Sequence, residues 1–166
     1  MKNALIIALA ALVTFSVSAA ERIVLQDTFD DSKNWFRNGK SGKFNFSDAG
    51  KDGKCLNIIN ADNIFMCNIS KTLPVKNNAT VKVTFDAKGT GEFSLNPMGR
   101  GPGVTVYLPA KHIKLTDAKN WQAFEYTFQL TDVKNKKALD NLAFRLNFYK
   151  NCNIMVDNFK ITAVEK

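Results

Sequence analysis

The sequence predicts an all-β fold, arranged as a two-sheet antiparallel β-sandwich. After residue 22, apolar residues recur at every second position in short runs, and the longest run covers residues 124–130. Gly, Asn, Asp and Pro separate the runs, and the 3.6-residue period of an amphipathic helix is nearly absent. Strands with one apolar face and one polar face form antiparallel sheets, which bury their apolar faces against each other.

The alternating runs give the predicted strands in chain order, each bounded by turn residues. We expect strands at 23–29, 44–46, 55–59, 64–69, 81–85, 93–95, 104–108, 124–130, 142–148 and 154–161. We predict irregular segments at 30–43, 96–103 and 109–120. Loops of this kind on a rigid sandwich are where binding residues tend to collect.

The last predicted strand contains a change of phase. Ile154 and Val156 alternate on one face, but the apolar set then resumes at Phe159 and Ile161. A slip of one residue sends later side chains to the other face, so the pattern predicts a β-bulge at Asp157 and Asn158. An acid at such a slip suits either a structural metal or a tight contact with the backbone.

The N-terminus has the features of a secretory signal peptide, residues 1–19. Lys2 precedes an apolar run, and small residues follow, which predicts cleavage near Ala19. No later apolar stretch approaches the length needed to span a bilayer, so we expect no membrane span. We therefore expect a secreted or periplasmic protein with a single domain at 20–166.

The chain is basic, and this restricts the class of partner. It has 23 Lys and Arg against 15 Asp and Glu, a net charge of +8, and loss of Lys2 with the signal peptide leaves 22 − 15 = +7. An exported basic protein suggests an anionic surface or polymer as partner, although lysines also serve solubility alone. Export and the lack of a basic helix or a stacked-aromatic motif argue against nucleic acid, so we expect no nucleic-acid partner.

Three cysteines, Cys55, Cys67 and Cys152, occur in a compartment that permits disulfides. We expect the strands at 55–59 and 64–69 to form a hairpin with its turn near 60–63, and Cys55 and Cys67 could then face each other. The sequence leaves the pairing open, and an odd number leaves one thiol free or intermolecular. The spacings match no zinc pattern.

With these motifs in view, residues 22–165 resemble the jelly-roll carbohydrate-binding modules of the galactose-binding-like superfamily, which include cellulose-, xylan- and β-glucan-binding types. Five segments carry the resemblance by their order and spacing: QDTFD at 26–30, DGKCLNI at 52–58, TVKVTFDAKGTGEFSL at 80–95, NWQAFEYTFQL at 120–130 and IMVDNFKI at 154–161. The resemblance implies a jelly-roll sandwich, and it does not fix the ligand.

The resemblance also implies a structural calcium ion, Ca2+. Carried over to this chain, its oxygen ligands are Asp30, the carbonyl of Lys54 and Asp157. The family more often has Glu at the position of Asp30, and the shorter Asp side chain extends less far toward an ion. The alternative is that Asp30 caps a turn and Asp157 binds backbone amides at the bulge.

Sugar binding needs flat apolar surfaces together with polar groups for hydroxyls. The polar face of the penultimate strand offers Arg145 and Asn147, with Tyr149 at its end, and Tyr107 points with Thr105 to the face away from the core. The loops add Trp35, Phe36, Arg37 and Arg100. The alternatives are that Trp35 is buried at one end of the core, that Arg100 is only an exposed turn residue, and that Arg145 and Asn147 belong to an ordinary solvent-exposed sheet face.

Enzymatic activity is not expected. The one histidine, His112, has no nucleophile motif near it, the acids are scattered through turns, and the GRGPG segment lacks the Lys-Ser/Thr of a phosphate loop. We therefore expect an exported carbohydrate-binding protein for a soluble or acidic polysaccharide or a cell-envelope glycan, with weak self-association. A structural or adhesive envelope protein without a sugar site is the alternative, followed by a small polysaccharide hydrolase or lyase.

Overall fold

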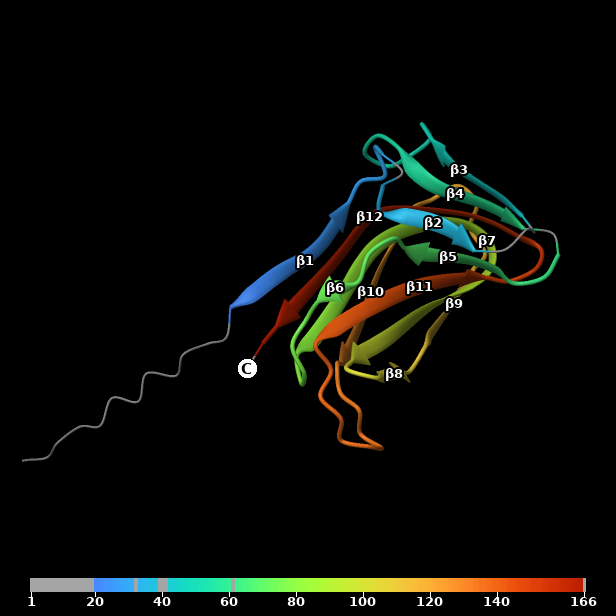
Figure 1. Ribbon diagram of the computed structural model, residues 1–166. Helices are drawn as coiled ribbons and strands as arrows, with labels where there is room; N and C mark the ends of the chain where they lie inside the picture. The colour runs from blue at the N-terminus through green and yellow to red at the C-terminus, as the bar shows by residue number, and fades with distance from the viewer. Residues whose placement is uncertain (1–19, 32, 39–41, 61, 166) are drawn as a thin grey trace, which may run out of the picture.

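The computed structural model describes residues 20–165 except 32, 39–41 and 61, and in this part of the chain all secondary structure is β-strand (Figure 1). The predicted signal peptide, residues 1–19, lies outside the described residues. The strands are β1 Glu21–Asp27, β2 Trp35–Asn38, β3 Lys43–Ser47, β4 Cys55–Asn60, β5 Phe65–Ile69, β6 Leu73–Pro74, β7 Thr80–Gly101, β8 Val104–Tyr107, β9 Lys111–Leu115, β10 Gln122–Gln129, β11 Asn141–Phe148 and β12 Cys152–Val164. Among the described residues, no helix of the length and apolarity needed to cross a bilayer occurs.

The strands pair antiparallel in two stacked sheets, which confirms the predicted all-β sandwich. In sheet A, the order is β3-β4-β12-β7-β10, and β1 pairs with the C-terminal half of β12. In sheet B, the order is β2-β5-β11-β7-β9, with β6 beside β11 and β8 beside the end of β7. Residues 80–90 of β7 belong to sheet A and residues 91–101 belong to sheet B.

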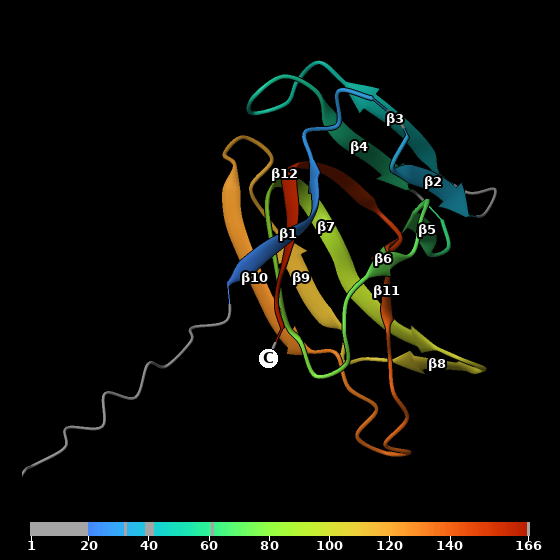
Figure 2. The same cartoon turned by 60° about the vertical axis from the view of Figure 1, so that its left-hand side comes forward.

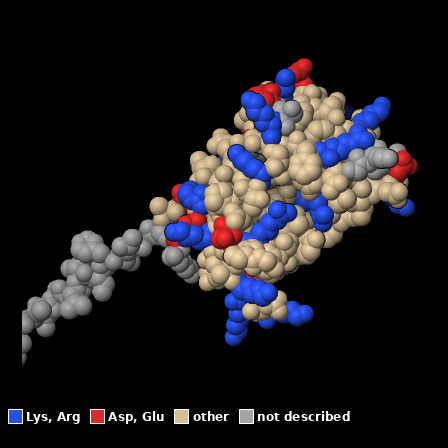
Figure 3. Space-filling view, in the orientation of Figure 1, with Lys and Arg blue, Asp and Glu red and all other residues tan. Residues whose placement is uncertain are grey.

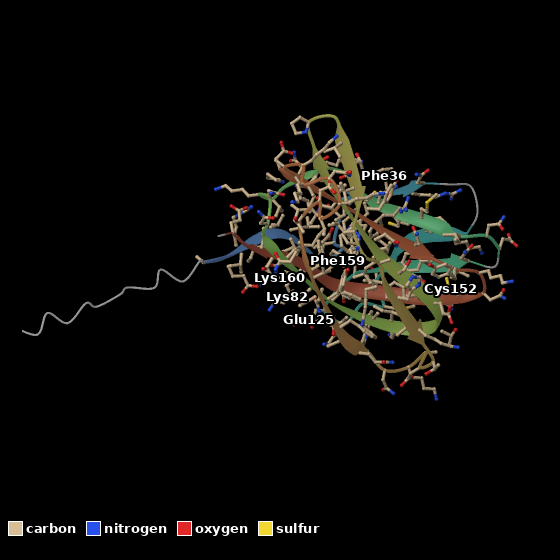
Figure 4. All side chains as sticks on the ribbon, turned by 90° about the horizontal axis from the view of Figure 1, so that it is seen from below. Phe36, Lys82, Glu125, Cys152, Phe159 and Lys160 are labelled. Atoms are coloured by element: carbon tan, nitrogen blue, oxygen red, sulfur yellow. The ribbon has the colours of Figure 1, made fainter. Side chains whose placement is uncertain are left out.

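The core lies between the sheets and is rich in phenylalanine. The largest fully buried aromatic side chains are Phe29, Phe65, Phe93, Phe144, Phe148 and Phe159. Figure 4 places Phe159 in the interior, with Phe36 on one side of it and Lys82, Lys160 and Glu125 on the other. The apolar residues of the period-two patterns therefore lie between the two sheets, as expected, and the outer faces of the sheets are exposed to solvent.

The three predicted loops are wrong in part, because each contains strand. Segment 30–43 includes β2, segment 109–120 includes β9, and segment 96–103 belongs mostly to β7. Gly and Pro usually interrupt strands, but here residues 96–100 pair with β11 on one side and residues 98–101 with β8 on the other. This tertiary pairing overrides the local turn signals, and Figure 2 shows the C-terminal end of β7 beside β8.

Glycines allow β7 to pass from one sheet to the other without a break. Gly89 and Gly91 have φ of 132° and 109°, a region that side-chain-bearing residues rarely adopt. A Cβ atom at Gly89 would lie 2.1 Å from the carbonyl oxygen of Asn153 on β12, and one at Gly91 would lie 2.5 Å from Cβ of Cys152. Both positions therefore require glycine for backbone geometry and for close approach to β12.

The predicted bulge in the closing strand is confirmed. The register of β12 against β7 shifts between Asp157 and Lys160, and Asn158 has a φ of 50°. Phe159 and Ile161 then return to the core, both with no exposed surface. Asp157 itself is fully buried at the slip.

The predicted hairpin between 55–59 and 64–69 is wrong. Strand β4 pairs with β3 and β12 in sheet A, whereas β5 pairs with β2 and β11 in sheet B. Cys55 and Cys67 therefore lie in different sheets, and all three cysteines are free and buried. The chain therefore passes from sheet A to sheet B between β4 and β5.

Candidate functional site

The outer face of sheet B, the side turned away from the core, carries a row of polar side chains. Residues opposite each other on antiparallel strands share a face. Arg145 lies opposite Asn96 of β7 and Asn68 of β5, and Asn68 lies opposite Phe36 of β2. These four side chains thus form one row across the outer face.

A second row runs parallel to the first, two residues along the strands. Asn147 lies opposite Ser94 of β7 and Met66 of β5, and Ser94 lies opposite His112 of β9. The amide of Asn96 donates to Ser94 Oγ at 2.9 Å, which ties the two rows together. The centre of the outer face is therefore polar and spans neighbouring strands.

One end of the outer face is hollowed beside Arg100. This hollow has a volume of about 320 Å³, near the lower end of the range for small-molecule pockets. Its lining residues are Phe36, Asn38, Asn68, Ile69, Met98, Arg100, Tyr107, Ala143, Phe144 and Arg145. The lining thus combines two exposed aromatic rings with two arginines and contains no acidic residue.

A larger hollow, of 910 Å³, lies at the opposite end of the outer face, where β7, β9 and the β11–β12 turn meet. It is lined by Asp62, Asn63, Ile64, Gly91, Glu92, Lys114, Tyr149, Lys150 and Asn151. The charges here are mixed, and Lys114 Nζ lies 3.6 Å from Glu92 Oε1. The two ends of the face therefore differ in charge.

Two buried polar atoms on the outer face have no hydrogen-bond partner among the described residues, Arg145 Nε and Asn147 Oδ1. Leaving a buried donor or acceptor unpaired costs about 1–3 kcal/mol. Both side chains as a whole are only half-buried, so an incoming molecule can approach them. The two atoms themselves are buried, so a ligand that supplies one acceptor and one donor would remove this cost once the two side chains turn toward it.

Tyr149, Ser94 and His112 form a small cluster beside the larger hollow. The Tyr149 hydroxyl lies 3.3 Å from Ser94 Oγ and 3.5 Å from His112 Nδ1, and the Tyr149 and His112 rings stack with centroids 6.0 Å apart. Ser94 has no exposed surface, which leaves its hydroxyl out of reach of a polymer in solvent. The cluster accordingly shapes the face and fixes the orientation of the Tyr149 ring.

The structure places most of the predicted ligand residues on this one face. Arg100, Tyr107 and Arg145 line the smaller hollow, Tyr149 lines the larger one, and Asn147 lies between them. Tyr107 is 71% exposed, which confirms that it points away from the core. Their role in binding stays a prediction.

The prediction for Trp35 as a ligand residue is wrong. Its side chain is only 3% exposed, and it packs edge-on against Phe159 with ring centroids 5.1 Å apart. The indole N–H donates to Asp27 Oδ2 at 2.7 Å, and Asp27 Oδ1 accepts from the amide of Phe29 at 2.7 Å. A tryptophan held in this way closes one end of the core and cannot lie against a sugar.

Several residues of the outer face were not among the predicted ligands, namely Asn68, Asn96, Met98 and His112. Phe36 was a candidate expected on a loop, but it follows the buried Trp35 on strand β2, and the alternation of that strand points it outward. Asn96 and His112 fell in segments that we predicted as loops. The sequence carries no signal that places these three on the same face, since their strands meet only in the folded sheet.

The residues predicted to bind calcium are engaged in other contacts. Asp157 Oδ2 accepts from the amides of Lys51 and Asp52 at 2.7 and 3.3 Å, and Oδ1 accepts from the amide of Asn158 at 2.7 Å. Asp30 is exposed and accepts from the hydroxyl of Thr28 at 2.7 Å. Calcium takes six to eight oxygens at once, and no group of three or more His, Cys, Asp or Glu suited to a metal occurs in the described residues.

A lysine supplies positive charge beside this position. Lys51 Nζ lies 3.1 Å from both carboxylate oxygens of Asp86, which is opposite Asp157 in the sheet. The side-chain amide of Asn158 donates to Asp86 Oδ2 and to Asp52 Oδ2, each at 3.0 Å. The donor set thus does not fit a calcium ion, and it fits the alternative in which Asp157 binds backbone amides at the bulge.

Neither a protein-family model nor a curated protein sequence matches this chain. Solved structures do match. The CBM22-1 xylan-binding domain of Xyn10C from Paenibacillus barcinonensis superposes with a TM-score of 0.64 at 17% identity, over 90% of this chain and 99% of that one. The family 11 carbohydrate-binding module from Clostridium thermocellum, solved with a β-1,3-1,4-mixed-linked tetrasaccharide, gives 0.57 at 19% identity, over 85% and 94%.

A third structure of similar fold is the enzymatically active domain of tailspike protein 4 from bacteriophage CBA120. It gives a TM-score of 0.63 at 9% identity, over 82% of this chain but only 20% of that one. Two of the three structures thus match this chain along nearly their whole length, and both are carbohydrate-binding modules. The chain therefore has the jelly-roll β-sandwich fold of the carbohydrate-binding modules, as its sequence resemblance implied.

Proposed function

We propose that this protein binds a polysaccharide, without cleaving it, along the outer face of sheet B. The observation that carries the proposal is the pair of buried, unpaired polar atoms on Arg145, which lines the smaller hollow, and on Asn147, which lies between the two hollows. The neighbours of the same fold include a xylan-binding domain and a module solved with a mixed-linked tetrasaccharide, which supports a carbohydrate as the ligand.

The face has the chemistry that pyranose rings require. The exposed rings of Phe36 and Tyr107 offer flat apolar surfaces to C–H groups, and Asn68, Asn96 and Asn147 offer amides to hydroxyls. From Glu92 to Arg100, β7 extends for about 26 Å at ~3.3 Å per residue. A site of this length suits several consecutive sugar rings better than a single one.

The charge of the smaller hollow favours an acidic sugar. Arg100 and Arg145 both line it, neither forms an ion pair with a described residue, and no Asp or Glu joins the lining. A guanidinium group binds a carboxylate through two parallel hydrogen bonds. The carboxylate of a uronic acid bound at this hollow would pair with an arginine. The pyranose ring of the same sugar would then contact the aromatic side chains.

Export fits this function, since such polysaccharides lie outside the cell. The predicted signal peptide and the net charge of +7 that remains after its removal support a secreted or periplasmic protein at an anionic glycan of the envelope or surroundings. A single face binds weakly, so weak self-association would raise the avidity.

The experiment is a retention screen of residues 20–166 against neutral and acidic polysaccharides at low and high salt. We expect retention by a uronate-containing polysaccharide that persists at high salt and falls in the Arg145→Ala variant. Binding to every polyanion that disappears with salt would contradict a specific site and favour a structural envelope protein. Release of soluble products from a bound polysaccharide would instead show a hydrolase or lyase.

A further inference from the structure

The loop between β10 and β11 carries a cluster of lysines whose side chains have no role in the contacts among the described residues that hold the fold together. Lys134, Lys136 and Lys137 are all exposed, and none forms an ion pair with a described residue. Figure 3 shows Lys and Arg side chains gathered where this loop, residues 131–140, projects from the sandwich. We call residues 134–137 the basic tip.

The loop is anchored, so the basic tip has a defined place. Leu139 is buried, and its amide donates to Asn77 Oδ1 at 3.2 Å. At the base, Asp132 is 2% exposed and its Oδ1 accepts from the amide of Asn135 at 3.0 Å. The two acids of the loop, Asp132 and Asp140, thus lie at its two ends. The basic tip itself contains only lysines and an asparagine.

The anchor joins the loop to the arginine end of the outer face. The amide of Asp140 donates to the carbonyl oxygen of Arg100 at 2.9 Å, and Asn141 lies opposite Arg100 in the sheet. In Figure 1 the loop extends beyond the end of the sandwich from the point where β11 begins. A chain that lies along the outer face and leaves it at Arg100 therefore passes close to the basic tip.

We propose that the basic tip is a second contact for the same anionic polysaccharide, which binds the outer face by an internal stretch of its length and continues over the loop. This inference rests on the proposed function, and it adds that the ligand is a long acidic polymer rather than a free chain end or a short oligosaccharide. Charge complementarity supports the occupant, because three lysines outside any ion pair face solvent next to a hollow lined by two arginines.

The test compares a short galacturonate oligomer, which fits within the outer face, with long polygalacturonate. The variants are the triple change Lys134→Gln, Lys136→Gln and Lys137→Gln, and a control with the same loss of charge in sheet A and its turns, Lys43→Gln, Lys54→Gln and Lys119→Gln. Each exposed charge contact contributes little, so we expect the triple loop variant to bind the long polymer about tenfold more weakly at low salt. Its affinity for the oligomer and its thermal midpoint should equal those of the wild type.

The outcomes separate the inference from the proposed function. Equal losses in the loop variant and the control variant, or no loss in either, would overturn the role of the basic tip while oligomer binding upholds the outer face. Failure of the wild type to bind either probe would overturn both. Loop-dependent binding to vesicles of anionic phospholipid, with no effect on the polymer, would assign the tip to a membrane surface and overturn the inference.

Discussion

Phe36 and Tyr107 lie at opposite edges of sheet B and line the same hollow. Phe36 is on β2, the outermost strand on one side, and Tyr107 is on β8, beyond β7 on the other. They are 46% and 71% exposed, although most large apolar side chains of the chain are buried. Arg145 and Arg100 line the hollow with them, so the exposed rings border a cationic site.

The first prediction concerns these two rings. Replacing either by alanine removes an apolar surface for sugar rings without removing core contacts. We expect Phe36→Ala and Tyr107→Ala each to weaken polysaccharide binding by about 3- to 10-fold, with an unchanged thermal midpoint. Affinity electrophoresis and thermal denaturation measure the two quantities.

Ile23→Ala is the matched control, because Ile23 is 54% exposed on β1 of the other sheet. It should leave binding unchanged. A loss of binding in this control as large as in Phe36→Ala would show that exposed apolar area in general, and not the outer face of sheet B, determines retention.

The second prediction is that Arg145→Met separates binding from stability. Methionine keeps the apolar stem and removes a guanidinium whose Nε is buried and unpaired. We expect the free energy of unfolding to stay the same or to rise by about 1 kcal/mol, because an unsatisfied buried donor is lost. Binding of an acidic glycan should fall by about tenfold or more, since hydrogen bonds to charged groups contribute ~1.5–3 kcal/mol.

Chemical denaturation and isothermal titration measure these two effects. Lys160→Met is the control, since Lys160 is a half-buried basic residue on sheet A. Strong destabilisation by Arg145→Met would instead mean that the guanidinium supports the fold, and a role in ligand binding would then need separate evidence.

The third prediction concerns Asp157 at the bulge. Its carboxylate accepts from the amides of Lys51, Asp52 and Asn158, and its side chain has no exposed surface. Asp157→Ala leaves these amides without an acceptor, so we expect a loss of about 2–4 kcal/mol in the free energy of unfolding. Urea denaturation measures it, with the exposed Asp48→Ala as control. An effect below that of the control would contradict the role of Asp157 in fixing the turn.

The fourth prediction is that calcium does not stabilise the protein. The amides around Asp157 and the Lys51 ammonium beside Asp86 leave no set of carboxylates suited to the ion among the described residues. We expect the same thermal midpoint in excess calcium and in excess chelator. A midpoint that rises with calcium concentration, as ligand linkage requires, and not with magnesium would restore the calcium site at Asp30, Lys54 and Asp157.

The fifth prediction is that the native thiols are unreactive. Burial raises the pKa of Cys55, Cys67 and Cys152 above the ordinary value, so less thiolate forms at any given pH. We expect almost no reaction with a thiol-specific reagent at pH 8 in buffer and rapid reaction of all three in denaturant. Rapid modification of one thiol in the native protein would show that its strand opens locally.

Much of the fold and part of the site follow from local pattern. Period-two alternation identified the core positions of β7, β10 and β11, because a strand sends successive side chains to opposite faces whatever its partner. The same rule put Arg145 and Asn147 on one outer face and located the bulge at Asp157.

Tertiary structure decided which strands meet and therefore what surrounds each residue. Contacts between segments far apart in the chain place β4 and β5 in different sheets and keep β7 continuous through its glycines and proline. Such contacts also determine the hydrogen-bond partners of Trp35 and Asp157. Sequence by itself determined the alternation, the charge and the class of fold, because these are properties of short stretches. Only the packed sheets decided that Phe36, Asn68, Asn96 and Tyr107 share a face with Arg145, since that face is made by hydrogen bonds between separate strands.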